Sequence, residues 1–183
     1  YKRSLSILNL DKIKIDHPIR PFSLMLRGSI FSIMGNYEKS IDSFKECVEK
    51  SKDELDDKVT KKEKRQLLIN KDICLLGISR TYFAKKDYKK AADYFSKALE
   101  IDAIDGENQK LESSKNVPLS DGSYKELKTI DDAIEYYSYN LWAESFNEGI
   151  SLIAQGKNEK AIELFLVAVK FQPEEPKSHN ALA

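Results

Sequence analysis

The sequence predicts an all-α fold, a right-handed superhelix of stacked helix pairs, because three segments share one spacing of small and aromatic residues. In each segment a small residue is followed four positions later by Phe and three positions after that by another small residue, which places all three on one helix face. Such a repeat is typical of solenoids, in which each unit packs only on its neighbours. We expect each Phe to be buried within its own helix pair. The triplets are Ser40, Phe44 and Cys47; Ala91, Phe95 and Ala98; and Ala161, Phe165 and Ala168.

A predicted turn precedes each triplet. Gly and Asn in these turns can adopt a left-handed backbone at low cost. Each turn follows an apolar helical stretch with a small residue seven positions ahead of it, where a neighbouring helix can approach closely. The turns are Gly35-Asn36-Tyr37, Lys86-Asp87-Tyr88 and Gly156-Lys157-Asn158, and the small residues are Gly28, Ser79 and Gly149.

We expect residues 1–183 to form a single domain of helical repeats. The clear repeats cover about 21–54, 72–105 and 142–175, and partial elements cover 1–20, 123–141 and 176–183. Because the chain does not begin with Met, we also expect it to be a fragment of something longer.

Two insertions separate the clear repeats. The first contains Thr60 followed three residues later by Glu63, a helix-start signature, and predicts one long helix from about 61 to 85. The second begins with residues 106–122, rich in Ser, Asn, Gly and Pro, which we interpret as a loop. Beyond it, Thr129–Gln155 is either another extended helix or part of a degenerate repeat, and we favour the extended helix.

The three segments resemble the tetratricopeptide repeat (TPR), a 34-residue helix–turn–helix unit with the pattern W-x2-L-G-x2-Y, A-x3-F and P. The second and third triplets match best, and Pro173 supplies the closing proline of the third. Arg27 and Glu148 occupy positions where the family prefers Leu. The leading Trp is replaced by Leu24, Leu75 and Ser145. The resemblance implies a TPR solenoid with extended or inserted helices between repeats.

The resemblance also implies a concave groove, lined by the first helices of the pairs, that binds a peptide. The expected ligand is a protein or peptide with an apolar or amphipathic segment, because the implied positions are mostly apolar. The inserted segments could instead fill part of this groove. One subclass of the family binds the C-terminal carboxylate of chaperone peptides through Lys, Asn and Arg side chains at set positions of the groove. Of the residues at those positions in this chain, only Asn147 could contribute, so we argue against a chaperone C-terminal peptide as the ligand. The implied groove residues are Met25, Ser29, Ile33, Leu76, Arg80, Phe83, Phe146, Asn147 and Ile150.

Composition narrows the functional classes. Lys+Arg and Asp+Glu both number 30, so net charge gives no reason to bind nucleic acid. The sequence contains no apolar run long enough to span a membrane. Two cysteines provide neither a disulfide framework nor a metal spacing, and Cys47 fills a core slot. We therefore expect no catalytic residues, cofactor or metal, and no direct membrane insertion.

The sequence therefore favours a protein–protein interaction scaffold or adaptor and not an enzyme. One alternative is a structural module that self-associates. Another is the non-catalytic regulatory part of a longer enzyme. The compartment stays open, with the cytoplasm favoured.

Overall fold

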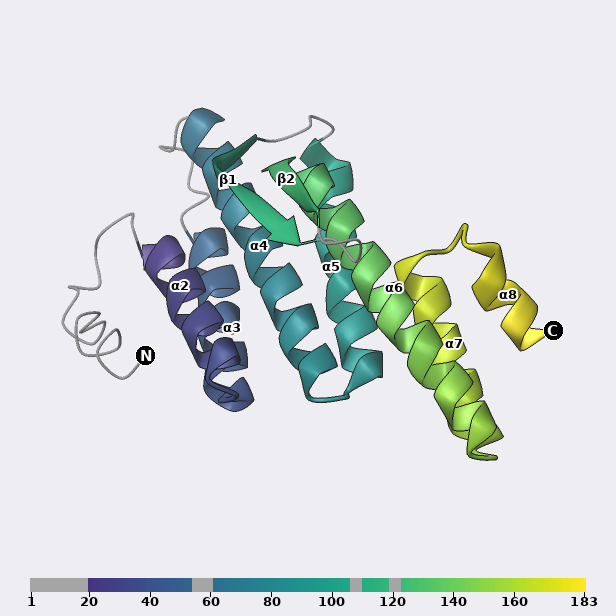
Figure 1. Cartoon of the computed structure of the whole chain (residues 1–183). Helices are drawn as coiled ribbons and strands as arrows, with labels where there is room; N and C mark the ends of the chain where they lie inside the picture. The colour runs from purple at the N-terminus through teal and green to yellow at the C-terminus, as the bar shows by residue number, and fades with distance from the viewer. Residues whose placement is uncertain (1–19, 54–60, 106–109, 119–122) are drawn as a thin grey trace.

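The computed structural model describes residues 20–53, 61–105, 110–118 and 123–183, which form seven helices and one two-stranded hairpin (Figure 1). In chain order the elements are α2 (Arg20–Ile33), α3 (Tyr37–Asp53), α4 (Lys61–Ala84), α5 (Tyr88–Asp105), β1 (Lys110–Pro118), β2 (Tyr124–Thr129), α6 (Ile130–Ala154), α7 (Asn158–Phe171) and α8 (Pro176–Leu182).

Consecutive helices pack as antiparallel pairs, α2 with α3, α4 with α5 and α6 with α7, and the pairs follow one another in chain order (Figure 1). Helix α3 also packs along α4, so the first two pairs form one continuous stack. Helix α8 packs on α7 at the C-terminal end. This confirms the predicted solenoid of stacked helix pairs.

The three predicted turns join the helices of each pair. Their backbones are left-handed at Gly35 (φ 73°), Lys86 (φ 61°) and Gly156 (φ 73°), which lets the chain reverse within a few residues. In the first turn the Asn36 backbone N–H donates to the Phe31 carbonyl at 2.9 Å, satisfying an orphan carbonyl at the helix end.

The predicted core is confirmed, because Phe44, Phe95 and Phe165 are all buried. Glycines allow this packing. A Cβ added at Gly28 or Gly77 would lie 2.9 Å or 2.6 Å from the Phe44 ring, closer than real contacts allow. The Phe44 ring is therefore held between the first helix of its own pair and the first helix of the next.

Buried serines fasten the two helices of a pair to each other. The Ser40 hydroxyl of α3 donates to the Gly28 carbonyl of α2 at 2.8 Å. In the second pair the Ser79 hydroxyl of α4 donates to the Ala91 carbonyl of α5 at 2.7 Å. Small polar residues in these slots therefore keep the helices close while satisfying their own hydrogen bonds.

The two extended helices form as predicted. Helix α4 covers 24 residues and confirms the long helix expected over 61–85, although its proposed start at Thr60 lies outside the described residues. Helix α6 starts at a capping box, in which the Thr129 side chain accepts from the Asp132 N–H at 3.1 Å and the Asp132 carboxylate accepts from the Thr129 N–H at 3.0 Å. An extended helix is therefore the correct alternative here.

The loop interpretation of residues 106–122 is wrong at 110–118, which form strand β1 antiparallel to β2. The hairpin is anchored through Leu127 of β2, which is buried against Ala133 and the partly buried Tyr136 and Tyr137 of α6. Contact with α6 thus supplies the apolar packing that the polar sequence of β1 lacks.

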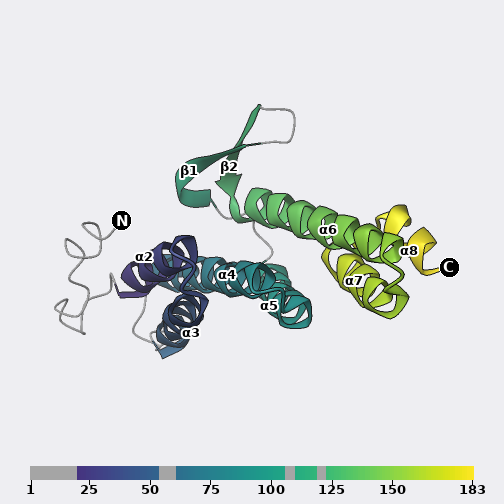
Figure 2. The same ribbon diagram turned by 60° about the horizontal axis from the view of Figure 1, so that its bottom comes forward.

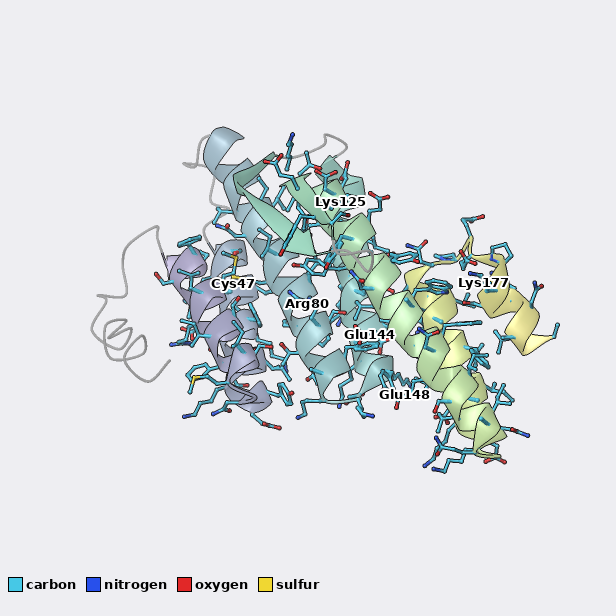
Figure 3. The ribbon with its side chains drawn as sticks, viewed as in Figure 1. Cys47, Arg80, Lys125, Glu144, Glu148 and Lys177 are labelled. Atoms are coloured by element: carbon cyan, nitrogen blue, oxygen red, sulfur yellow. A yellow bond between two sulfur atoms is a disulfide. The ribbon has the colours of Figure 1, made fainter. Side chains whose placement is uncertain are left out.

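The cysteines also depart from the sequence analysis, because Cys47 of α3 and Cys74 of α4 form a disulfide, with Cα atoms 6.3 Å apart. The yellow bond near Cys47 in Figure 3 marks it. The sequence did not show this pairing because it depends on the register of α3 against α4 across a separation of 27 residues. The bridge joins the first helix pair to the second.

The contact between the second and third helix pairs differs from the contact between the first and second. Helix α5 makes little contact with α6; instead α4 faces α6, and α5 faces α7. The hairpin is inserted between α5 and α6 in the chain, so α6 does not follow α5 through a short turn. The result is a looser joint between the second and third pairs than between the first and second.

Candidate peptide-binding face

The first helices of the pairs, α2, α4 and α6, lie on one side of the molecule, and α3, α5 and α7 lie on the other (Figure 2). This arrangement follows from the alternation of first and second helices along the stack. The side formed by α2, α4 and α6 is the face on which the sequence places its nine candidate residues, and we call it the first-helix face.

The nine candidates differ in exposure. Met25 and Phe146 are partly buried, and Leu76 and Phe83 are buried. The exposed ones are Ser29, Ile33, Arg80, Asn147 and Ile150. Ile33 and Ile150 expose 69% and 48% of their surface, so both α2 and α6 present large apolar side chains to solvent.

Leu76 and Phe83 belong to the hydrophobic core and do not offer contact surface. The Phe83 ring packs edge-on against Tyr88 at 5.0 Å and against Phe171 at 6.1 Å between ring centroids. The sequence could not show this, because Phe171 reaches Phe83 only through the contact between the second and third pairs. A charged residue at 83 would therefore disturb the fold and could not serve as a test of binding alone.

Arg80 is fixed in place on α4. Its guanidinium carbon lies 4.3 Å from the centroid of the Tyr137 ring on α6, a cation–π contact. Figure 3 labels Arg80 on α4, the central helix of this face. The contact joins α4 to α6 and orders an exposed cationic group before any partner arrives.

Phe146 lies between α6 and α7 at the edge of the core. Its ring stacks on Trp142 at 5.7 Å and tilts against Phe165 at 5.4 Å between centroids. The Trp142 indole N–H in turn donates to the Ser178 hydroxyl of α8 at 2.8 Å. Phe146 is thus a partly exposed member of a rigid aromatic row.

The hairpin stands on the same side of the helices as the first-helix face, above the start of α6 in Figure 2. An inserted segment therefore stands beside the first-helix face at the start of α6. Any ligand on this face would therefore be bounded by the hairpin at that end.

A polar cluster missed by the sequence analysis joins the second pair to the third. The Tyr88 hydroxyl donates to the Glu148 carboxylate at 2.5 Å, and the Lys86 ammonium pairs with it at 3.0 Å. The hydrogen bond from Tyr88 lowers the pKa of Glu148, and burial together with this hydrogen bond raises the pKa of Tyr88. The available signal was Glu148 itself, which stands where the repeat pattern prefers Leu.

No helix among the described residues is long and apolar enough to cross a bilayer. No group of three or more His, Cys, Asp or Glu side chains in those same segments could hold a metal ion.

Comparisons with known proteins identify the repeats. The sequence model of the tetratricopeptide repeat matches residues 23–53 and 74–105, which cover most of the first two helix pairs, so these two segments are tetratricopeptide repeats. No curated protein matches the chain. Among solved structures, the chain resembles the C-terminal TPR-containing domain of a Plasmodium falciparum FK506-binding protein, with 20% identity, 90% of this chain and 85% of that chain covered, and a TM-score of 0.40. This assignment concerns the two matched segments, which lie in the first two helix pairs.

TPR repeats are interaction modules in general, and TPR domains are generally non-catalytic scaffolds that bind proteins or peptides. The matched repeats support that coarse assignment for this chain.

Proposed function

We propose that the chain is a non-catalytic adaptor that binds an apolar or amphipathic segment of a partner protein on the first-helix face. The observation that carries the proposal is the pair of exposed isoleucines, Ile33 on α2 and Ile150 on α6, on a face whose middle holds the ordered guanidinium of Arg80. Peptide recognition commonly combines apolar anchors with a few polar contacts that fix register.

The polar contacts would come from Arg80 and Asn147, both exposed. Binding an acidic C-terminal peptide requires several charge-assisted hydrogen-bond donors, and the nine candidate residues include one cationic side chain, Arg80. We therefore expect a ligand whose affinity changes little with salt, because screening weakens exposed ion pairs and not apolar contacts.

The test is selection from a random peptide display library with this chain as bait. The proposal predicts enriched peptides with apolar residues at a regular spacing and affinity that is unchanged when the peptide C-terminus is amidated. Enrichment of peptides that require a free, acidic C-terminus would contradict it.

The mass of the protein in solution distinguishes an adaptor from a self-associating module. Sedimentation over a range of concentrations should give a constant monomer mass if the first-helix face is kept for a partner. A mass that rises with concentration, and falls back when Ile33 is changed to Glu, would assign that face to self-association.

A further inference from the structure

The looser joint between the second and third helix pairs contains a cleft of about 990 Å³. One wall is the turn that joins α4 to α5, and the other is formed by α6 and α7. Figure 3 shows Glu148, one of its lining residues, between α6 and the α4–α5 turn. None of the nine candidate residues of the first-helix face lines this cleft, so it is a separate surface.

The inner part of the cleft is apolar. Leu164 and Val167 of α7 are buried behind it, and Leu152 of α6 is partly exposed. Leu166 lies at its edge and exposes 53% of its surface. A large aliphatic side chain left this open beside a concave surface is a suitable anchor for an apolar side chain of a partner.

The rim is basic, although the chain as a whole is neutral. Five lysines and three acidic residues line the cleft, which gives it a net charge of +2. The lysines are Lys85, Lys86, Lys89, Lys160 and Lys170, and the acidic residues are Asp87, Glu148 and Glu163.

Most of these charges already have partners. Glu148 forms an ion pair with Lys86 at 3.0 Å, and Asp87 forms one with Lys90 at 2.7 Å. Lys85 pairs with Glu38 at 2.5 Å. Lys89 and Lys160, one on each side of the cleft, have no ion-pair partner within the described segments and face solvent. Lys170 pairs with Asp93 at 3.3 Å, and exposed Glu163 of α7 also has no ion-pair partner in those segments. The two unpaired lysines and this one carboxylate leave a net positive charge, with one lysine on each side of the apolar part.

We propose that this cleft docks an acidic amphipathic segment of a partner protein, with apolar side chains against Leu152 and Leu166 and carboxylates near Lys89 and Lys160. An apolar strip with a basic rim is complementary to an apolar stripe with acidic flanks, and this complementarity selects the partner's charge. The inference concerns a second surface and does not depend on the function proposed for the first-helix face.

The test uses synthetic peptides of roughly 18 residues, with Leu at helical spacing and Glu elsewhere, and a matched peptide with Gln in place of Glu. We expect the Glu peptide to bind and to weaken as salt is raised. The Lys89→Glu/Lys160→Glu variant should weaken it by about tenfold or more, and Leu166→Ser by about tenfold.

Matched controls keep this result specific. Lys45→Glu/Lys97→Glu makes the same charge change on α3 and α5, outside the cleft. Ile162→Ser removes a similarly exposed side chain, 48% against 53%, one turn before Leu166 and not lining the cleft. Both controls should bind the Glu peptide as the wild type does, and so should Ile150→Glu on the first-helix face.

Several outcomes would overturn the proposal. One is that the Gln peptide binds as tightly as the Glu peptide. Another is that the control variants lose as much affinity as the cleft variants. A third is that Ile150→Glu abolishes binding, which would show that the peptide binds on the first-helix face. A concentration-dependent dimer abolished by Leu166→Ser would assign the cleft to a second copy of the chain instead. The peptide titrations test the cleft, and the library selection tests the first-helix face. A negative result in one experiment therefore does not decide the other.

Discussion

At the scale of the residue, one aromatic side chain in each pair organises the packing of both helices. Phe95 is fully buried and meets the Phe171 ring edge-on at 5.3 Å, so it links the second pair to the third as well as its own two helices. The sequence predicted its burial from spacing alone, because the small residues around it recur with it. It did not predict Phe171 as a neighbour, because that contact depends on how the pairs stack.

Changing Phe95 to Ala should lower the free energy of unfolding by about 3–5 kcal/mol, since a large buried ring is removed and its cavity remains. Phe22, which is exposed on α2, is the matched control: its change to Ala should cost within about 0.5 kcal/mol. Chemical denaturation measures both. Equal effects at the two positions would refute the repeat register.

Gly77 should not tolerate Ala, because the new Cβ would lie 2.6 Å from the Phe44 ring. We expect a loss of about 1–3 kcal/mol in unfolding free energy, as for other overpacked sites. A double variant with Phe44→Leu should recover part of the loss, because the smaller side chain makes room. If the losses in unfolding free energy of the two single variants simply add in the double variant, residues 44 and 77 do not contact each other.

Glu148 should make stability depend on pH. Its pKa in the folded protein is lowered from 4.5, chiefly by the hydrogen bond from Tyr88, so its stabilisation is present above the unfolded pKa and is lost as pH falls through the folded one. The stability gap between wild type and Glu148→Gln should therefore shrink between about pH 5 and about pH 3. Exposed Glu144→Gln is the control, and a constant Glu148→Gln gap across this range would contradict the assignment.

At the scale of the element, the sequence predicted helices and turns well and the hairpin poorly. The apolar period is clear in α2, α3, α5 and α7 and weak in the two long helices α4 and α6. The turns carry Gly35 and Gly156 at left-handed positions. Strand β1 has no alternating pattern, and the one available signal was Asp121-Gly122, a dipeptide common in hairpin turns. Packing of Leu127 on α6 is a tertiary contact that local pattern cannot reveal.

The capping box of α6 gives a prediction for an inserted element. Thr129→Ala should cost about 0.5–2 kcal/mol in unfolding free energy, because the Asp132 N–H loses its acceptor. Thr129→Ser keeps the hydroxyl and should restore most of this. A Ser variant as unstable as the Ala variant would mean that the hydroxyl is not the cap.

The disulfide gives a second prediction at this scale. Reduction, or the double change Cys47→Ala/Cys74→Ala, should lower the unfolding free energy by about 3–4 kcal/mol, because the closed loop spans 27 residues. Melting curves with and without reductant, beside thiol titration of the unfolded protein, measure this. Two free thiols in protein purified without reductant would contradict the bridge.

Disulfides are rare in cytosolic proteins and persist in oxidising compartments. The bridge between Cys47 and Cys74 therefore argues against the cytoplasmic location that the sequence analysis favours.

At the scale of the whole molecule, the stack presents two surfaces of different chemistry. The first-helix face presents exposed Ile33 and Ile150 beside the ordered guanidinium of Arg80, and the cleft at the joint combines apolar side chains with a basic rim. The position of the first surface could be predicted from the family resemblance, because it follows from which helix comes first in each pair. The cleft could not, because it arises where the inserted hairpin separates α5 from α6 in the chain.

The most direct test of the adaptor role compares two isoleucines with the same exposure, 48% each, on opposite helices of the third pair. A peptide selected by this chain is titrated against wild type, Ile150→Glu on α6 and Ile162→Glu on α7, with folding checked by circular dichroism. Binding on the first-helix face predicts that Ile150→Glu weakens affinity by about tenfold or more while Ile162→Glu leaves it unchanged. Unchanged affinity in Ile150→Glu, or an equal loss in both variants, would show that the first-helix face is not the binding surface.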